Sequence, residues 1–359
     1  MARSYNFSPG PAVLPHEVLL QAQQEFLEWS EGVSALEHSH RSPIFMELAA
    51  TLREQFREIL NIPKNYHILF MQAGGTAQFA AVPLNLLRGK NTADYVATGF
   101  WSERAIAEAK LYCNVNVVAS NAHLNYAAIP DFSTWKLNPE APFLHYVTNE
   151  TIHGIEFPYV PKIGNVPLVA DMSSNILSKP IDVSDYGLIY AGAQKNIAPA
   201  GLTLVIVRED LVGHANPMTP AILDYKRFVP DGFYNTPVTF SFYMAHLALS
   251  WLKKQGGLPA MDELNQRKAK DLYATIDNSN GFYINNVQPE FRSRMNIPFG
   301  LTNTQLEEDF LRDASAEGLV NLRGHKSVGG IRASIYNAMP EAGVRSLIEF
   351  MNFFAQRYG

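Results

Sequence analysis

The sequence has very little cysteine, no concentrated charge and no long apolar run, and each absence excludes a class of protein. Cys113 is the only cysteine, which excludes an internal disulfide and predicts a reducing compartment. The 29 basic and 34 acidic residues give a net charge of −5 without any basic block, so nucleic-acid binding is not expected. The aliphatic runs are too short to span a membrane, and the N-terminus lacks the apolar stretch of a signal peptide. We therefore expect a cytoplasmic protein without membrane contact.

What the chain does contain is enough apolar sequence for a large core. Hydrophobic residues make up 47% of its 359 residues, which predicts a folded protein of more than one domain. Between residues 67 and 207, short apolar runs alternate with helical patterns. This alternation predicts an α/β fold, in which helices flank a mostly parallel seven-stranded sheet. The expected strands are 67–71, 94–97, 115–119, 143–148, 168–171, 188–191 and 202–207.

The helical patterns divide the chain into three expected parts. Residues 1–15 contain several prolines and predict an extended segment. A large domain is expected over 16–258 and a smaller α+β domain over 259–359, because glycines and a proline stop a helix near 256. Expected helices include 16–29, ended by Gly32, one that starts at Pro43 with Ser42 as its cap, 260–277, and 304–317 with Thr304 as its cap.

One lysine lies between two of the expected strands. Lys195 is surrounded by small residues and side-chain amides in the stretch 191–201, AGAQKNIAPAG. Partial burial lowers the pKa of a lysine, because desolvation disfavours the charged form. Part of the amine is then neutral near pH 7, as imine chemistry with a carbonyl requires. The alternative is a loop lysine that reaches solvent along its aliphatic stem.

Other polar residues lie where strands end, and α/β sheets form their sites at these ends. Asp171 ends one expected strand, 24 residues before Lys195, so the two side chains can meet across a parallel sheet. Gly75 and Thr76 follow a strand and begin a helix, which presents free backbone N–H groups to an anion. The alternatives are an aspartate that caps a turn and a glycine pair that only makes one.

Together these residues match the polar groups of pyridoxal phosphate. Lys195 would bind the aldehyde carbon, and Asp171 would pair with the protonated ring nitrogen. Trp101 would stack on the ring, Thr151 would bond its hydroxyl, and the turn 75–76 would hold the phosphate. The alternative for Trp101 is a core tryptophan.

Ten stretches spread over the chain resemble one known family. They are NFSPGPA near the start, SHRS (39–42), QFAAVPLN (78–85), GFW (99–101), NETIHGI (149–155), ADMSSNILS (170–178), YAGAQKNIAPAGLT (190–203), YNTPVTF (234–240), RSRMNIPF (292–299) and GHKSVGGIRASIYNAMP (324–340). The chain resembles the phosphoserine aminotransferases, class V aminotransferases of the fold-type-I pyridoxal phosphate family. The resemblance runs essentially from end to end and makes the large domain the one that binds the cofactor.

The resemblance implies a role for each matching position. Lys195 is the expected Schiff-base lysine and proton carrier, and Asp171 is the expected partner of the ring nitrogen. The further expected cofactor contacts are Gly75, Thr76, Trp101, Thr151, Gln194, Asn235 and Thr236. The last two are expected from the second subunit of a homodimer with shared active sites.

The resemblance also implies a substrate pocket and no metal. Arg332 is expected to clamp the α-carboxylate, a bidentate pairing that arginine suits. Other expected substrate contacts are Ser8, and His40, Arg41, His325 and Lys326 for the distal phosphate or the glutamate γ-carboxylate, some of them across the dimer. The chain departs from the family at two positions. Thr76 stands where arginine is frequent, which removes one candidate phosphate contact, and Lys326 stands where some members have arginine.

The implied reaction transfers the amino group of L-glutamate reversibly to 3-phosphohydroxypyruvate, giving O-phospho-L-serine and 2-oxoglutarate in serine biosynthesis. A second candidate substrate is the homologous keto acid of vitamin B6 synthesis, which gives 4-phosphohydroxy-L-threonine. Cysteine desulfurases of the same fold need a mobile cysteine nucleophile downstream of the lysine. The single cysteine, Cys113, lies upstream of Lys195, so this chemistry is excluded. The alternatives are a serine–pyruvate type transaminase, which would not need the basic cluster, and a catalytically silent α/β binding module.

Overall fold

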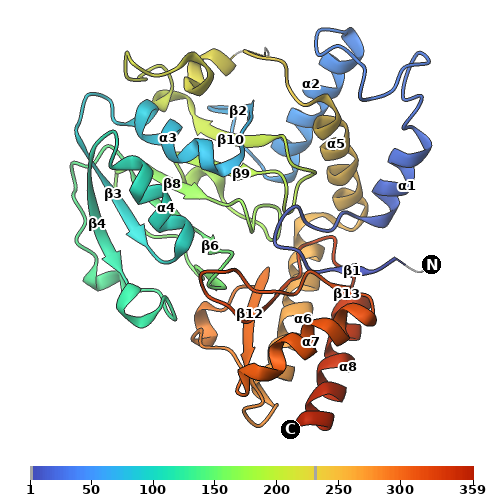
Figure 1. The fold of residues 1–359 in the computed structure, drawn as a ribbon. Helices are drawn as coiled ribbons and strands as arrows, with labels where there is room; N and C mark the ends of the chain where they lie inside the picture. Colours follow the sequence, from blue (N-terminus) through green and yellow to red (C-terminus); the bar gives the residue numbers. More distant parts are fainter. Residues whose placement is uncertain (1–2, 230–232) are drawn as a thin grey trace.

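A seven-stranded sheet forms the centre of the larger part of the molecule (Figure 1). The computed structural model describes residues 3–229 and 233–359, so the first two residues of the expected N-terminal segment lie outside it. The sheet order is β2-β10-β9-β8-β5-β3-β4. The strands are β2 (Tyr66–Met71), β3 (Thr92–Ala97), β4 (Asn114–Ser120), β5 (Leu144–Val147), β8 (Leu168–Asp171), β9 (Leu188–Gly192) and β10 (Thr203–Arg208).

Only β10 runs against its neighbours in this sheet. It pairs antiparallel with β2 and with β9, whereas the remaining pairs are parallel. The predicted seven strands and their mostly parallel arrangement are therefore confirmed. Short hydrophobic strands with intervening helices were the signal, because the parallel pairs need crossover connections.

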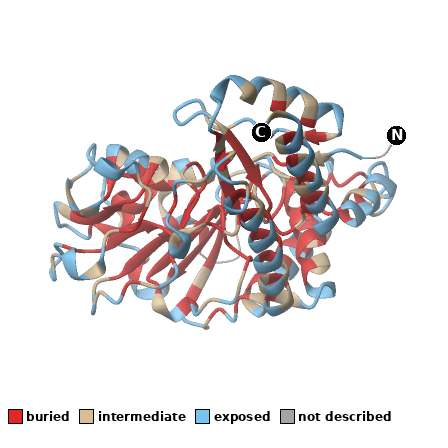
Figure 2. Cartoon of the chain, turned by 90° about the horizontal axis from the view of Figure 1, so that it is seen from below, coloured by how far each residue is buried: buried red, intermediate tan, exposed pale blue. Residues whose placement is uncertain are grey.

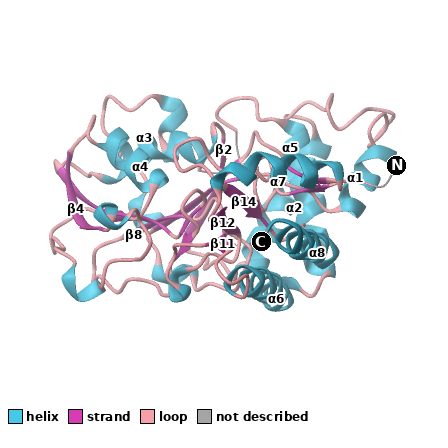
Figure 3. Cartoon of the chain, turned by 60° about the horizontal axis from the view of Figure 1, so that its bottom comes forward, coloured by secondary structure: helices cyan, strands magenta, loops and turns pink. Residues whose placement is uncertain are grey.

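Helices cover both faces of the sheet, which explains why its strands are apolar along their whole length. On one face, α3 and α4 share an apolar cluster with Val169 and Val205. On the other, α2 and α5 share a cluster with Ala170 and Ile206, the next residues along the same strands. This alternation is the period of two expected of a strand. Figure 2 shows the strands as buried, and Figure 3 shows α3 and α4 together over one side.

Eight α-helices lie in the described part of the chain, and several begin where the sequence predicts. They are α1 (His16–Gln24), α2 (Pro43–Ile59), α3 (Gly74–Leu86), α4 (Phe100–Ala109), α5 (Thr239–Lys254), α6 (Gly257–Asp277), α7 (Glu307–Ala316) and α8 (Glu341–Tyr358). The start of α2 follows the capping rule, because the Ser42 hydroxyl accepts a hydrogen bond from Phe45 N at 3.2 Å. Among the described residues, no helix has both the length and the hydropathy needed to cross a membrane.

The C-terminal part has a sheet and an apolar cluster of its own, which confirms the smaller α+β unit. Its antiparallel strands are β11 (Tyr283–Ile284), β12 (Asn296–Leu301) and β14 (Ile331–Ser334). Helices α6, α7 and α8 pack around them (Figure 1). Two short strands, β1 (Tyr5–Asn6) and β13 (Leu319–Val320), pair in parallel at its edge.

The N-terminal segment packs against this C-terminal part. Phe7 and Val13 lie in its apolar cluster, and Phe7 is 0% exposed. A short antiparallel hairpin of β6 (Asn149–Glu150) and β7 (Ile155–Glu156) forms a separate two-stranded sheet and contacts the C-terminal part, where Ile155 bridges Arg292. The division of the chain at 15 and 258 stays a prediction.

Two predicted helix boundaries, one C-terminal and one N-terminal, are wrong. α1 ends at Gln24 rather than 29, so Gly32 does not terminate it. Leu27, beyond its end, is 84% exposed, so the apolar pattern there does not form a packed helical face. The predicted helix over 304–317 opens with a single 3-10 turn, and Asn303 rather than Thr304 provides the cap by accepting from Gln305 N at 3.2 Å.

Candidate active site

The carboxyl ends of β8 and β9 bring Asp171 and Lys195 to the same place. The two strands are parallel neighbours in which Asp171 stands opposite Tyr190, and Lys195 follows the end of β9. The charges interact, because Lys195 lowers the pKa of Asp171 and Asp171 raises that of Lys195. The structure therefore brings the two side chains close together, as their spacing in the sequence predicts.

The Lys195 amine is enclosed rather than free in solvent. Its Nζ donates to Thr151 Oγ1 at 2.6 Å and lies 5.7 Å from the centre of the Trp101 ring. Burial lowers the pKa of Lys195 to about 8, against the opposing effect of Asp171 and with a smaller contribution from the positive Arg332. A fraction of the amine is thus neutral near pH 7, as the sequence predicts.

The N-terminal segment supports the lysine loop from behind. Ala12 N donates to the Gln194 carbonyl at 2.9 Å. A Cβ on Gly10 would lie 3.3 Å from Lys195 Cγ, so the missing side chain permits this close approach. Ser8 lies in the same turn, where its hydroxyl accepts from Gly10 N at 3.4 Å. Ser8 therefore lies near the loop without touching Lys195 in the described contacts.

Asp171 is a buried carboxyl with several donors around it. It is 6% exposed, and its Oδ1 accepts from Ser173 N at 2.8 Å. Burial raises the pKa of Asp171, whereas hydrogen bonds from Ser173 and Tyr190 and the charge of Lys195 lower it. These donors favour the ionised form at a site where burial disfavours it.

The start of α3 lies beside Asp171 and offers backbone donors. Among the residues that the structure describes, no side chain caps this helix, so its first N–H groups, including those of Gly75 and Thr76, have no capping side chain. A Cβ on Gly75 would lie 3.0 Å from Ser173 Oγ and 3.7 Å from Asp171 Oδ2. Glycine therefore keeps open a space between the helix start and the carboxylate, and Thr76 is exposed at its edge.

A buried glutamate that sequence reasoning missed fixes the start of α4. Glu150 is 0% exposed and accepts from Trp101 N at 3.0 Å and Ser102 N at 2.8 Å. Desolvation raises the pKa of Glu150 to about 7, although the two N–H bonds oppose the shift. A Cβ on Gly99 would lie 2.5 Å from Glu150 Cδ, so glycine is required for this contact. The acid in NETIHGI, next to Thr151, was the available signal.

Arg332 is a buried cation without an acid beside it. It lies on β14, is 5% exposed, and donates from Nη1 to the Thr151 carbonyl at 3.4 Å. Its Nε has no hydrogen-bond partner, and within residues 3–229 and 233–359 no carboxylate pairs with it. Burial lowers the pKa of this guanidinium. A buried, unpaired guanidinium is costly, so the site favours an anion here.

The loop that precedes β14 carries His325 and Lys326, two further basic residues that the sequence predicts to bind substrate. The His325 ring lies 5.1 Å from the ring of Phe100, the residue before Trp101. Burial lowers the pKa of His325, and the positive charges of Arg332 and Lys326 lower it further. Lys326 is exposed. Both basic groups therefore lie near Arg332.

Four other predicted residues lie apart from Lys195 in the single chain. The centres of the His40 and Phe233 rings lie 6.3 Å apart, and Arg41 is exposed just before α2. Among the described contacts, neither touches Lys195, Asp171 or Arg332. Asn235 and Thr236 lie near the start of α3 of their own chain, where the Thr236 carbonyl accepts from Gln72 Nε2 at 2.8 Å.

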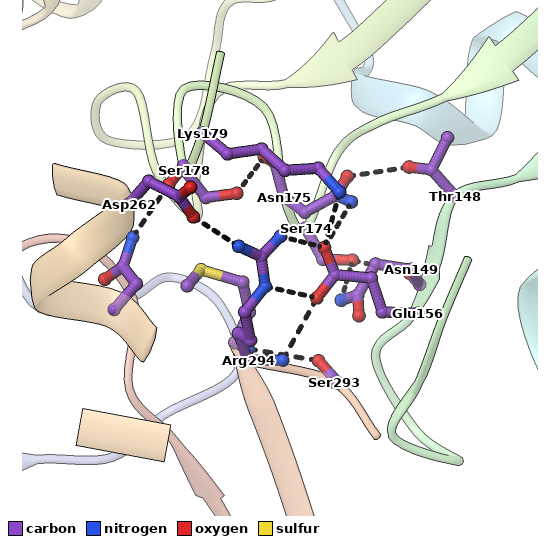
Figure 4. Close-up of polar contacts among 12 residues, drawn as sticks. Thr148, Asn149, Glu156, Ser174, Asn175, Ser178, Lys179, Asp262, Ser293 and Arg294 are labelled. Carbon is purple, nitrogen blue, oxygen red and sulfur yellow. Dashed lines mark hydrogen bonds and ion pairs between the residues drawn. The ribbon is translucent and has the colours of Figure 1, made fainter. Parts of the chain in front are cut away.

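A partly buried ion-pair network joins the large sheet to the C-terminal part (Figure 4). Glu156 on β7 is 4% exposed and pairs with Arg294 Nη2 at 2.7 Å, and Arg294 also pairs with Asp262 on α6. Asn175 donates to Glu156 at 3.4 Å, and the Thr148 hydroxyl lies 2.6 Å from Asn175 and 2.9 Å from the last carbonyl of β8. The network thus fixes the end of β8 relative to β12.

Comparison with known proteins identifies the family. A family model described as Aminotransferase class-V matches residues 4–347. The chain belongs to the class V aminotransferases. Within them it is a member of the phosphoserine aminotransferase family, since a phosphoserine aminotransferase from Acidithiobacillus ferrooxidans is 54% identical over 357 residues, 99% of each chain.

Two solved structures of phosphoserine aminotransferases match the whole fold. One, from Bacillus circulans subsp. alkalophilus, has a TM-score of 0.97 at 44% identity and covers 99% of each chain. Another, from Trichomonas vaginalis with PLP bound, has a TM-score of 0.94 at 41% identity, and covers 98% of this chain and 100% of that one. The resemblance and the fold class expected from the sequence are confirmed.

The predicted site residues thus fall into two groups in the single chain. One group gathers around Lys195 within the single chain: Gly75, Trp101, Thr151, Asp171, Gln194, His325 and Arg332. His40 and Arg41 lie elsewhere in the same chain. Glu150 is a buried group beside them that sequence reasoning did not include.

Proposed function

We propose that the chain transfers the amino group of L-glutamate reversibly to 3-phosphohydroxypyruvate, giving O-phospho-L-serine and 2-oxoglutarate. One observation supports this above all. The Lys195 amine is held between Thr151 and Trp101, opposite the buried Asp171 and near the unpaired Arg332. An enclosed amine with a lowered pKa, an acid and an anion-binding arginine are the groups that a transaminase of this family needs.

The residues around Lys195 fit pyridoxal phosphate, the cofactor of this family. The space kept open by Gly75 and the free N–H groups at the start of α3 suit the phosphate. Asp171 would face the ring nitrogen, Trp101 would stack on the ring, and Thr151 would bond the ring hydroxyl. Gln194 is the further candidate for the phosphate. When bound, the cofactor supplies an electrophilic carbon and an electron sink for the substrate.

Lys195 is the group proposed to move the proton. Its partly neutral amine can take the proton from the substrate α-carbon and return it on the other side of the reaction. Asp171 as a carboxylate stabilises positive charge at the ring nitrogen, and burial strengthens that interaction. Burial around the amine also excludes water, which would otherwise compete for the proton.

Arg332 and the basic cluster are proposed to select the substrate. The Arg332 guanidinium can bind the α-carboxylate through two parallel hydrogen bonds, one of them from Nε, which has no partner among the described residues. His325 and Lys326 lie near it and suit a distal phosphate or carboxylate. Ser8 is a further candidate contact, held near the lysine loop by the N-terminal segment.

We infer a cytoplasmic homodimer in which the partner subunit completes each site. Its His40 and Arg41 would join the distal pocket, and its Asn235 and Thr236 would reach the cofactor phosphate. Exposed apolar side chains beside these segments support a contact surface there. Leu36, 49% exposed, and Val238, 43% exposed, are close to them in sequence, and the ring of Phe26, 45% exposed, lies 6.2 Å from that of Phe240.

A half-reaction tests the proposed function. Protein loaded with pyridoxal phosphate should be yellow, and its visible band should shift when O-phospho-L-serine or L-glutamate is added. Unphosphorylated serine should shift it far more slowly. Equal rates with serine and phosphoserine would instead indicate a serine–pyruvate type transaminase. A colourless protein that binds no pyridoxal phosphate would leave a silent binding module.

A further inference from the structure

A line of polar side chains runs inward from Asp171 into the core of the sheet. Asp171 and Tyr190 stand opposite each other on β8 and β9, so their side chains project from the same face. The Tyr190 hydroxyl interacts with the Asp171 carboxyl, whose pKa it lowers, and lies 2.8 Å from Nε2 of His145 on β5. Tyr190 and His145 are 0% and 1% exposed, so bulk water does not reach this line.

Aromatic stacking fixes the orientation of the His145 ring. The ring stacks on Tyr95 at 5.0 Å with an interplanar angle of 30°, and on Tyr190 at 5.9 Å with an angle of 26°. The edge of Tyr190 also reaches the cofactor side, since a Cβ on Gly75 would lie 3.5 Å from its Cε2. The line therefore joins the candidate cofactor space to a rigid part of the core.

The positions of the hydrogens follow from what each group can donate. An ionised carboxylate only accepts, so Tyr190 donates its single hydroxyl hydrogen to Asp171. The oxygen of Tyr190 can then only accept from His145, which requires the proton of the neutral ring on Nε2. Nδ1 is left without a proton and, among the described residues, it has no partner.

The opposite direction of these hydrogen bonds, in which Tyr190 donates to His145, is less favourable. With a protonated Asp171, Tyr190 could donate to Nε2 of His145, and the ring proton would have to lie on Nδ1. That would bury an N–H donor without an acceptor, and buried unpaired N–H groups are rarer and cost more than unpaired acceptors. Burial lowers the pKa of His145 to about 3, so the ring is neutral.

We propose that Tyr190 and His145 are positioning residues that hold the Asp171 carboxylate ionised and turned toward the cofactor ring nitrogen. The inference deepens the proposed function, since it rests on Asp171 facing that nitrogen. Other titratable side chains face the line without a described hydrogen bond to the carboxylate: Lys195 and Glu150 near Asp171, and Tyr95 and Tyr225 near Tyr190.

The first test compares two cofactors in Tyr190→Phe, which removes only the hydroxyl. We expect this variant to bind pyridoxal phosphate about tenfold more weakly than the parent chain. An analogue in which a C–H group replaces the ring nitrogen should lose no more than about twofold, because it makes no use of the Asp171 charge. Dissociation constants come from absorbance titrations of cofactor-free protein.

Tyr225→Phe is the matched control. Tyr225 lies in the same apolar cluster as Tyr190. Its hydroxyl donates to Gln78 at 2.9 Å rather than to Asp171. This variant loses a buried hydrogen bond of the same kind and should bind both cofactors like the parent chain. Equal losses for both cofactors in Tyr190→Phe, or no loss at all, would overturn the inference.

The second test reads the histidine directly and needs no cofactor. In protein labelled with ¹⁵N-histidine, the His145 signal, assigned by its absence in His145→Gln, should show a neutral ring protonated on Nε2 between about pH 5.5 and 8. A proton on Nδ1, or a doubly protonated ring, overturns the inference whatever the cofactor does. A parent chain that binds no pyridoxal phosphate overturns the proposed function instead.

Discussion

Glu150→Gln should change how the stability of the protein depends on pH. Burial raises the pKa of Glu150 from its usual 4.5 to about 7 in the folded protein. Between these values the folded state holds the proton more tightly than the unfolded state. The free energy of unfolding contributed by this residue therefore falls as pH rises through that interval. Glutamine does not titrate, so the variant lacks this pH dependence, although its Nε2 cannot accept the second backbone N–H bond and its stability is lowered at every pH.

The magnitude follows from the interval. Each unit of difference between the folded and unfolded pKa values corresponds to about 1.4 kcal/mol, so the raised pKa of Glu150 corresponds to about 3 kcal/mol. Between pH 5 and pH 8 the variant should therefore gain about 2 to 3 kcal/mol of stability relative to the parent chain. Urea unfolding of cofactor-free protein, followed by circular dichroism at both pH values, measures this difference without a contribution from cofactor affinity.

Glu103→Gln is the control, because Glu103 lies in the first turn of the same helix and is exposed. The change in its effect on the free energy of unfolding between pH 5 and pH 8 should be much smaller than that of Glu150→Gln, because Glu103 is exposed. If Glu150→Gln also shows no change between pH 5 and pH 8, Glu150 stays ionised throughout, and the reasoning from burial is refuted.

Three further predictions concern the cofactor and the substrates. Gly75→Ala should lower the affinity for pyridoxal phosphate about tenfold in an absorbance titration, because its Cβ would lie 3.0 Å from Ser173 Oγ; unchanged affinity would place the cofactor elsewhere. Arg332→Lys should lower kcat/KM about 100-fold for phosphoserine and for glutamate alike, since lysine keeps the charge but cannot pair through two parallel bonds; a loss for one substrate only would contradict an α-carboxylate contact. Arg41→Ala should raise KM for phosphoserine about tenfold and leave KM for alanine within about twofold. Equal losses on both would mean that the phosphate does not bind Arg41.

The sheet was predictable because local sequence determines it. Its strands are short apolar runs bounded by turns, and helices on both faces make each run apolar throughout. The end of α1 was not predictable in the same way. The apolar residues after Gln24 continue a helical pattern, yet Leu27 is 84% exposed, so tertiary packing rather than periodicity decides where the helix ends.

The candidate site was predictable where residues follow strand ends, as Asp171 and Lys195 do. Polar groups buried inside the fold were not. His145 lies within an apolar strand, and nothing in its neighbours along the chain indicates that it meets Tyr190. Glu150 has the same difficulty, because its partners are backbone N–H groups of a distant helix. Such pairings depend on contacts between segments far apart in sequence.

The most direct test of the account asks which amine binds the cofactor. Borohydride reduction of protein incubated with pyridoxal phosphate, followed by proteolysis and mass spectrometry, locates the lysine that becomes labelled. We predict stoichiometric label on Lys195 alone. The informative comparison is Lys268, which is also buried with a pKa lowered to about 7 but donates to three backbone carbonyls in the C-terminal part. Label on Lys268, or no label on Lys195, would contradict the assignment of this site.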